Sequence, residues 1–455
     1  MVKFQSSRGN TPTSFQDILL NGLAPDGGLY SPLTLPELDF SSSANFQEIV
    51  CELILGFSDN WIEKSDLIKM IDESYAEFRD PVLCPIKNLD EQKYLLDLTL
   101  GPTLAFKDFA LSLLARLLDY ELLNRGETAV VLGATSGDTG SAAIHALASC
   151  DRVKTVMLHP EGKVSDVQRR QMTTVNSPKV HNFAVDGSFD DCQDLVKQAF
   201  RDENLRTDLN LVAINSINFA RILIQIGYYF SAANQLSDKA VNGIDFVVPT
   251  GNFGNVLAGW YAKQLGAPIN NLFVGSNHNN AFHEFLDSGR LVSNIVKPSL
   301  SPSMDIQIPS NLERLLWEAS GRDSNAVAGL LTEFREVGEV SVPQAWVEFA
   351  RSQFSAFTVS DEMVLEKMRS VYELNNIVVD PHTAVGLVAA NELSGSELVV
   401  ICETASPAKF PDAVDQALGF RSQLPEFMSD LFDLPEQFSQ LDNSFKDLKH
   451  YLNSV

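Results

Sequence analysis

The chain has 455 residues, of which 45% are hydrophobic, and its 59 acidic and 34 basic side chains give a formal net charge of −25. This length exceeds what one core usually holds, so we expect two or three structural units. The negative charge disfavours nucleic acid and anionic membranes as partners, and the five cysteines have no C-x-x-C spacing that would indicate a disulfide framework or a zinc site. A polar start and the lack of an apolar run of about 18 residues predict a cytoplasmic protein that is not membrane-embedded.

The first 80 residues differ in pattern from the rest of the chain. Amphipathic helical spacing, as over residues 45–55, is more frequent there than strand-like runs. The stretch GLAPDGGLYSP over residues 22–32 gathers Gly, Pro and Asp and is typical of a turn that needs positive φ. The sequence therefore predicts an N-terminal, mainly helical unit over residues 1–80.

From about residue 94 onward, short β-branched runs alternate with helical stretches, for example TAVVLG followed by GSAAIHALA. This alternation is typical of parallel β-α-β units and predicts the α/β fold class. We expect residues 81–455 to hold two parallel-sheet α/β subdomains, the smaller one nested roughly at 105–240. The residues after about 423 are rich in Asp, Glu and Phe, and they are predicted to form an acidic connection or solvated tail.

Two turns that follow predicted strands have the composition of anion-binding sites. In GNFGN, residues 251–255, two glycines let the backbone approach a phosphate, and a helix N-terminus follows with unpaired N–H groups. In ATSGDTG, residues 134–140, hydroxyl and N–H groups also converge at a helix start. The first could equally be an ordinary β-α turn, and the second could be simple helix capping. The second matches neither G-x-S-x-G, nor a Walker loop, nor G-x-G-x-x-G.

Lys107 lies near the start of a predicted amphipathic helix, in GPTLAFKDFALSLLARLL. Its neighbours Phe106, Phe109 and Leu111 form apolar company that lowers the pKa of a lysine, so the amine is a candidate for imine formation with a carbonyl cofactor. The alternative is a side chain that extends to solvent. Thr404 follows a predicted buried strand and places a hydroxyl where a ring nitrogen could be met.

Seven motifs follow one another over nearly the whole chain: AFKD, GATSGDTGSAA, NSINFARI, PTGNFGNVLAG, SPSMDIQIPS, VDPHTAVG and TASPAKF. In identity and order, these motifs resemble the bacterial and fungal branch of the threonine synthase family. The resemblance implies the pyridoxal phosphate (PLP) fold type II of the tryptophan synthase β class, with an added N-terminal unit. It implies conversion of O-phospho-L-homoserine and water to L-threonine and phosphate, with PLP as cofactor.

The resemblance also implies roles for individual residues. Lys107 would be the Schiff-base lysine and proton carrier, and Thr404 would meet the pyridine nitrogen. The residues expected around the PLP phosphate are Gly251, Asn252, Phe253 and Asn255. The residues expected to bind substrate are Thr135, Ser136, Gly137, Asp138, Thr139, Arg221 and Lys409, with Arg8 and Lys163 as further candidate cations for the departing phosphate.

The sequence departs from the family pattern at two places near these residues. Glu403 and Ser406 stand where the family has Ser and His, and GSNHNN, residues 275–280, only approximates the expected Asn-rich segment. A phospho-lyase of the same fold that releases a 2-oxo acid, and a non-catalytic PLP-binding protein, stay open as alternatives. The expected partner is a small-molecule substrate, and the sequence leaves monomer and homodimer open.

Overall fold

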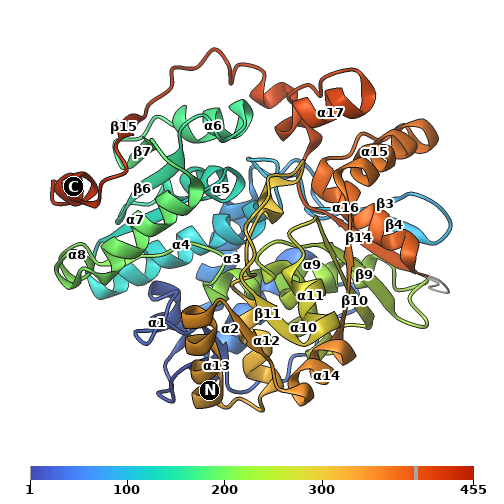
Figure 1. The fold of residues 1–455 in the computed structure, drawn as a ribbon, viewed down its shortest axis with the longest axis horizontal. Coiled ribbons are helices and arrows are strands. Elements are labelled where there is room, and N and C mark those ends of the chain that lie inside the picture. The colour runs from blue at the N-terminus through green and yellow to red at the C-terminus, as the bar shows by residue number, and fades with distance from the viewer. Residues whose placement is uncertain (1, 394–397, 455) are drawn as a thin grey trace.

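The computed structural model describes residues 2–393 and 398–454, and two parallel-type β-sheets form the centres of its two lobes (Figure 1). The larger sheet has six strands in the order β13, β10, β9, β14, β4, β3, all parallel except for β3. Their bounds are β3 (Ile86–Asn88), β4 (Lys93–Asp97), β9 (Ile244–Pro249), β10 (Ile269–Ser276), β13 (Phe354–Thr358) and β14 (Val399–Glu403). All residues of β9 and β14 are buried, as expected for central parallel strands that are covered on both faces.

The smaller sheet has five parallel strands in the order β15, β7, β6, β5, β8. They are β5 (Ala129–Ala134), β6 (Val153–Pro160), β7 (Val180–Val185), β8 (Leu211–Val212) and β15 (Ser439–Leu441). The helices of this lobe are α4 (Lys107–Arg125), α5 (Asp138–Leu147), α6 (Asp166–Thr173), α7 (Phe189–Arg201), α8 (Glu203–Asp208) and α18 (Phe445–Leu452). Apolar side chains of α7, α18 and the strands share one core cluster.

The N-terminal unit combines a two-stranded antiparallel sheet with helices. Its elements are β1 (Phe4–Ser6), α1 (Phe15–Leu20), β2 (Tyr30–Pro32), α2 (Phe46–Ser58) and α3 (Lys64–Tyr75). A capping box of Asn45 and Glu48 starts α2, which satisfies backbone N–H groups that the helix leaves unpaired. The predicted turn at 22–32 has Gly27 at φ 78°, as the Gly-rich composition indicated.

Further helices surround the larger sheet. They are α9 (Phe219–Gln235), α10 (Gly254–Gln264), α11 (Ala281–Ser288), α12 (Leu312–Ala319), α13 (Ser324–Val337), α14 (Gln344–Gln353), α15 (Asp361–Asn375), α16 (Pro381–Ala389) and α17 (Pro411–Leu418), with a hairpin of β11 (Arg290–Val292) and β12 (Glu339–Ser341). Short 3-10 turns are η1 (Pro302–Met304), η2 (Ala390–Glu392), η3 (Pro407–Lys409) and η4 (Glu426–Met428). The sequence predicts that the nested subdomain extends to about residue 240. In the structure, β8 is the last strand of the smaller sheet before β15. The helix that follows, α9, packs against α2 and α10.

The C-terminal segment is not a solvated tail as a whole. After α17 it runs across the top of the molecule to the smaller lobe (Figure 1), where β15 pairs with β7 and α18 packs on α7. Leu441, Leu448 and Leu452 are buried there, so apolar residues between the charged ones cover the β7 edge of the smaller sheet. In the described part of the chain, no helix is both long and apolar enough to cross a membrane.

Candidate active site

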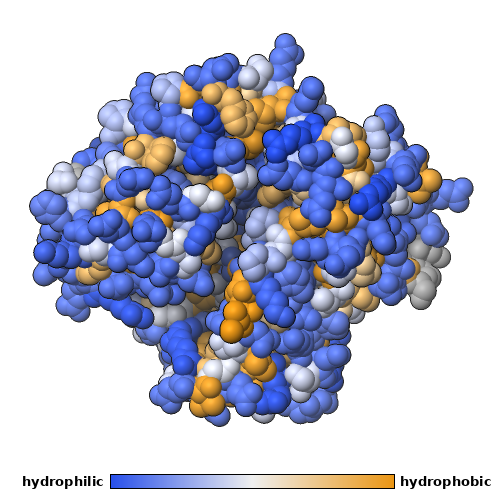
Figure 2. Space-filling view, turned by 45° about the horizontal axis from the view of Figure 1, so that its top comes forward, coloured by the Kyte–Doolittle hydropathy of each residue, from blue (hydrophilic) through white to orange (hydrophobic). Residues whose placement is uncertain are grey.

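A pocket lies where the two lobes meet, and Figure 2 shows the surface hollowed between them. About 670 Å³ of space in this pocket is free of protein atoms, and part of that space is open to solvent. Thr250 follows β9 and Thr404 follows β14, and both line the pocket. The pocket therefore sits beyond the carboxyl ends of parallel strands, where open α/β sheets bind ligands.

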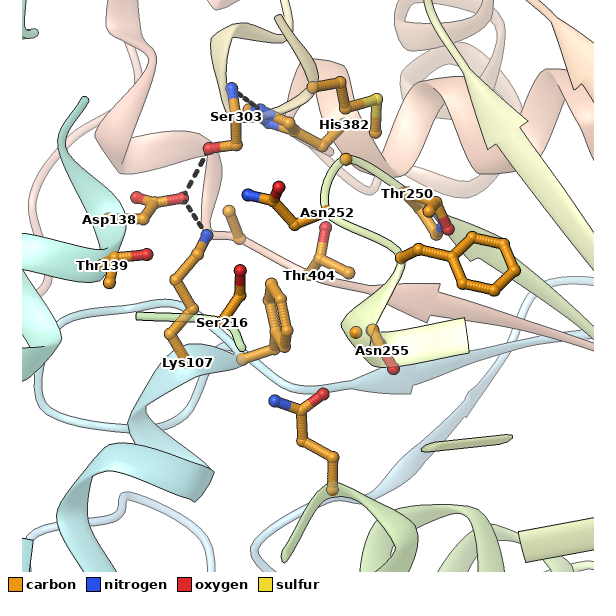
Figure 3. Close-up of a pocket in the computed structure, with 18 of the residues that line it drawn as sticks. Lys107, Asp138, Thr139, Ser216, Thr250, Asn252, Asn255, Ser303, His382 and Thr404 are labelled. Atoms are coloured by element: carbon orange, nitrogen blue, oxygen red, sulfur yellow. Dashed lines mark hydrogen bonds and ion pairs between the residues drawn. The ribbon is translucent and has the colours of Figure 1, made fainter. Parts of the chain in front are cut away.

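Lys107 is the first residue of α4 and points into this pocket (Figure 3). The preceding backbone is fixed, because the Phe106 N–H donates to the Thr404 carbonyl at 2.9 Å and Ala105 forms a β-bridge with Ala405. Its Nζ lies 4.7 Å from the centre of the Phe106 ring. Burial lowers the pKa of Lys107, in the direction that its apolar neighbours predicted, although the nearby Asp138 carboxylate opposes the shift.

The GNFGN loop joins β9 to α10 and forms another wall. A side chain at Gly251 would meet the Ser303 carbonyl oxygen at 2.4 Å, so only glycine lets the loop approach so closely. Phe253 takes a left-handed φ of 64°, and its ring packs against Phe282. Asn255, in the first turn of α10, binds the Tyr229 hydroxyl through Oδ1 at 2.9 Å, while its buried Nδ2 has no partner among the described residues. An anion at this helix start would satisfy that donor.

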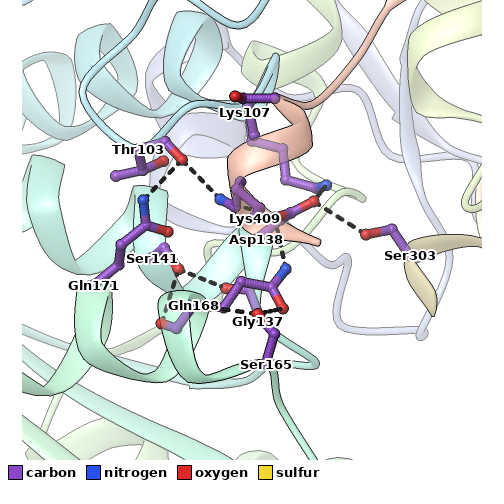
Figure 4. Close-up of polar contacts among 12 residues, drawn as sticks. Thr103, Lys107, Gly137, Asp138, Ser141, Ser165, Gln168, Gln171, Ser303 and Lys409 are labelled. Atoms are coloured by element: carbon purple, nitrogen blue, oxygen red, sulfur yellow. Dashed lines mark hydrogen bonds and ion pairs between the residues drawn. The ribbon is translucent and has the colours of Figure 1, made fainter. Parts of the chain in front are cut away.

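Asp138, the first residue of α5, is the one carboxylate among the described residues that line the pocket (Figure 4). Its Oδ2 accepts from Lys107 Nζ and from Ser303 Oγ, each at 3.0 Å. Its Oδ1 accepts from Gln168 Nε2 at 2.8 Å and from Lys409 Nζ at 2.9 Å. Burial opposes ionisation, but the charges of Lys107 and Lys409 outweigh it and hold the pKa of Asp138 well below its usual value.

Arg221, on α9, contributes a buried positive charge to the pocket. Its Nη1 donates to the Ile214 carbonyl at 3.2 Å, and its Nε has no partner within the described residues. Burial lowers the pKa of Arg221 to about 10, so the guanidinium stays charged at neutral pH. Ser216 and Gln225 line the pocket with it, and this polar corner suits an anionic group of a ligand.

Glu403, at the departure from the family pattern, lies behind the pocket and does not line it. It is the register partner of Asp97 on β4, and the two carboxylates share Lys87, whose Nζ lies 2.7 Å from Asp97 and 3.0 Å from Glu403. One lysine cannot neutralise two buried carboxylates, so burial and then the Asp97 charge raise the pKa of Glu403 to about 7.

The structure brings most predicted site residues together. The pocket is lined by Lys107, Asp138, Thr139, Arg221, Gly251, Asn252, Phe253, Asn255 and Thr404, as Figure 3 shows in part. Thr135, Ser136 and Gly137 lie in the turn just before α5, outside the lining. The Thr135 hydroxyl accepts from the N–H groups of Gly137 and Gly140 at 3.0 and 2.8 Å, so it shapes the turn.

Three predicted cations do not face the pocket. Lys409 is fully buried between Asp138 and the Thr103 carbonyl. Arg8 is committed to an ion pair with Glu313, and the exposed Lys163 donates to the Gly187 carbonyl at 3.0 Å. Arg221 is therefore the predicted phosphate cation that the fold places at the pocket.

The sequence did not indicate two side chains of the pocket, Ser303 and His382, that are linked by hydrogen bonds. In η1, Ser303 donates its backbone N–H to His382 Nε2 at 3.1 Å and its hydroxyl to Asp138. Asp380 accepts from His382 Nδ1 at 2.8 Å, which fixes the tautomer that leaves Nε2 as an acceptor. Both residues stand inside quoted motifs, SPSMDIQIPS and VDPHTAVG, so the signal was present although their sequence distance from Asp138 hid the contact.

Comparisons with known proteins agree over the whole length. Family models match for "Threonine synthase N terminus" over residues 3–75, "Pyridoxal-phosphate dependent enzyme" over 81–354 and "Threonine synthase, C-terminal" over 383–452. The threonine synthase of Pseudomonas aeruginosa is 44% identical, with 99% of this chain and 98% of that protein covered. The chain belongs to the threonine synthase family.

Solved structures of the threonine synthase family superpose closely on this fold. The PLP-bound threonine synthase from Brucella melitensis matches with a TM-score of 0.95 and 41% identity, covering 100% of this chain and 99% of that one. The yeast threonine synthase matches with a TM-score of 0.92 and 35% identity, covering 99% and 98%. These matches confirm the predicted fold type II architecture, a PLP-dependent lyase, and PLP as the cofactor.

The residues of the pocket fit this cofactor. The buried Lys107 amine lies in the pocket that also contains Asn255, with its unpartnered amide at the N-terminus of α10, and the Thr404 hydroxyl. A carbonyl, a phosphate and a ring nitrogen are the three groups of PLP that these residue types can hold. The pocket thus presents one matching residue type for each of these three groups of PLP.

Proposed function

We propose that this chain converts O-phospho-L-homoserine and water to L-threonine and phosphate. One observation supports the proposal most strongly: Lys107, Arg221 and the glycine-containing loop 251–255 line the same pocket, in a chain of the threonine synthase family. The same pocket brings together residues 107, 221, 251–255 and 404, which are far apart in sequence.

The proposed cofactor contacts follow from the chemistry of each wall. Lys107 holds the cofactor covalently, the N–H groups at the start of α10 and the Asn255 amide hold its phosphate, and the Thr404 hydroxyl faces its ring nitrogen. PLP, when bound, supplies an electron sink for negative charge at the substrate Cα. A neutral hydroxyl partner makes that sink milder than a carboxylate partner would.

The proposed substrate contacts use the charged groups that remain. Arg221 binds the substrate phosphate and stabilises the charge that develops as it leaves. The helix start at Thr139 offers backbone N–H groups to the substrate carboxylate, since a helix leaves its first N–H groups without intrahelical partners. The Lys107 amine carries the protons that leave Cα and Cβ, because loss of the γ-phosphate requires charge at Cβ.

The decisive assay measures products from O-phospho-L-homoserine. We expect phosphate and threonine in equal amounts, with no product from the Lys107→Ala variant. Phosphate accompanied by 2-oxobutyrate instead of threonine would show the phospho-lyase reaction, and a protein that binds PLP without releasing phosphate would show the non-catalytic alternative. Either result would contradict the proposal.

We also propose that the protein works in the cytoplasm with a small-molecule substrate as its partner. The acidic composition supports this, because a net charge of −25 repels nucleic acid and anionic membranes. Fractionation of cells that express a tagged chain would test the location.

A further inference from the structure

Asp138 is an unexpected residue for the mouth of a substrate-carboxylate site, since two carboxylates repel each other. Its oxygens already accept from four side chains: Lys107, Ser303, Gln168 and Lys409. With 3% exposure it is almost fully buried, so water does not compete for these bonds. Both oxygens of this pocket-lining carboxylate are therefore already engaged with protein donors.

The two lysines on Asp138 differ in what they can do. Lys409 is fully buried, and its Nζ also donates to the Thr103 carbonyl at 2.7 Å, so it is a fixed counter-ion. Lys107 lines the pocket, and its side chain is 11% exposed. When both lysines are charged, the group carries one net positive charge; when the Lys107 amine is neutral, Asp138 and Lys409 cancel.

The arrangement therefore sets the proton affinity of one amine. Asp138 favours the protonated form of Lys107, whereas the charges of Lys409 and Arg221 disfavour it. His382, the remaining titratable side chain on this side, is bonded to Asp380 and to the Ser303 backbone, and it interacts with Asp138. The Ser303 hydroxyl completes the cluster from the larger lobe, so Asp138 on the smaller lobe is held from both sides.

We propose that Asp138, paired with the buried Lys409, is a positioning residue that aims the Lys107 amine and sets its proton affinity for the reaction. This deepens the proposed function and rests on Lys107 being the cofactor lysine. It assigns Asp138 a part in proton transfer through Lys107 in place of direct substrate binding.

The test measures the Lys107 amine in cofactor-stripped protein. The rate at which added PLP restores the visible absorption band is recorded against pH, with the Lys107→Ala variant as the blank for other lysines. Only the neutral amine reacts, so the midpoint of the curve reports the pKa of Lys107. We expect Asp138→Asn to lower the midpoint by at least about 1 pH unit and Lys409→Gln to raise it, because they remove charges of opposite sign.

Ser303→Ala is the matched control, since it removes a neutral donor from the same oxygen of Asp138. Its midpoint should stay within about 0.5 pH unit of the wild type. An Asp138→Asn midpoint that does not fall, or shifts of the same sign in the Asp138 and Lys409 variants, would overturn the inference. An Asp138→Asn substitution that changes only KM for phosphohomoserine would also overturn the inference.

If Lys409→Gln does not fold, the midpoints of Asp138→Asn and Ser303→Ala alone still test the inference. A band that survives in Lys107→Ala would instead remove the proposed function itself.

Discussion

Arg221 carries a buried positive charge that has no carboxylate partner among the described residues. Replacing it with Gln should lower kcat/KM for phosphohomoserine about 10- to 100-fold, since a hydrogen bond to a charged group contributes about 1.5–3 kcal/mol and 1.4 kcal/mol is a factor of ten. Steady-state phosphate release measures the effect. Arg221→Lys keeps the charge and should lose less. Equal kcat/KM in the wild type and the Gln variant would place the phosphate elsewhere.

The raised pKa of Glu403 makes the free energy of unfolding depend on pH. Its folded-state pKa of about 7 lies above the unfolded value of 4.5. A raised pKa means that the folded state binds the proton more tightly, so this contribution is present below pH 4.5 and is lost as pH rises through about 7. The loss amounts to at most about 3 kcal/mol.

The Glu403→Gln variant should therefore show a flatter dependence of the unfolding free energy between pH 5 and 8, measured by urea denaturation. The exposed residue Glu91 provides the control, and Glu91→Gln should keep the wild-type slope. A Glu403→Gln slope equal to that of the wild type would mean that the pKa of Glu403 is not raised in the folded protein.

At single positions, sequence reasoning was strongest where local chemistry decides. The apolar neighbours of Lys107 predicted the direction of its pKa shift, and the glycines of GNFGN predicted a close backbone approach that Gly251 shows. It was weakest where a distant residue decides. Nothing near Lys409 in the sequence indicates that its ammonium group forms an ion pair with the distant Asp138.

Among the elements, the segment that carries Ser303 is held by the loop after β10. Asn277 is fully buried, and its Nδ2 lies 2.7 Å from Ser299 Oγ, 3.0 Å from Ser301 Oγ and 2.8 Å from Asp305 Oδ1, so that these three acceptors share its two N–H groups. These bonds hold the turn at η1 in place. They thereby position Ser303, whose hydroxyl donates to Asp138. GSNHNN therefore has a structural purpose even though it only approximates the family pattern.

The Asn277→Ala variant should lose about 1–3 kcal/mol of unfolding free energy, since it leaves buried polar partners unsatisfied. It should also lower kcat, because Ser303 loses its support. Thermal unfolding and phosphate release measure the two effects. His278→Ala, next to it on a partly exposed position, should change both much less. A stable Asn277→Ala enzyme with normal kcat would show that η1 needs no such anchor.

On the scale of the whole molecule, the chain enters the smaller sheet twice. The alternation of strands and helices predicted two parallel sheets, but not that Ser439 would pair with Phe183. A three-residue strand such as β15 has too little periodicity to detect, and its partner is set by the tertiary fold. The charged residues around it conceal the buried Leu448 and Leu452.

This closure predicts that the C-terminal helix stabilises the smaller lobe. Leu448→Ala should lower the unfolding free energy by about 2–5 kcal/mol, as for other buried Leu-to-Ala changes. Urea denaturation measures the change, and limited proteolysis should show earlier cleavage in the smaller lobe. Lys446→Ala, on an exposed position of the same helix, should stay within about 0.5 kcal/mol. An unchanged Leu448→Ala protein would mean that α18 only rests on the surface.

The measurement that tests the central claim most directly is the visible spectrum of the Lys107→Ala variant beside the wild type, each reconstituted with PLP and assayed for phosphate release. Lys163→Ala is the control, because Lys163 is exposed and lies outside the pocket. We expect the wild type and the control to show the protein-bound cofactor band and release phosphate, and Lys107→Ala to lose both. An unchanged band with continued phosphate release in Lys107→Ala would contradict the account.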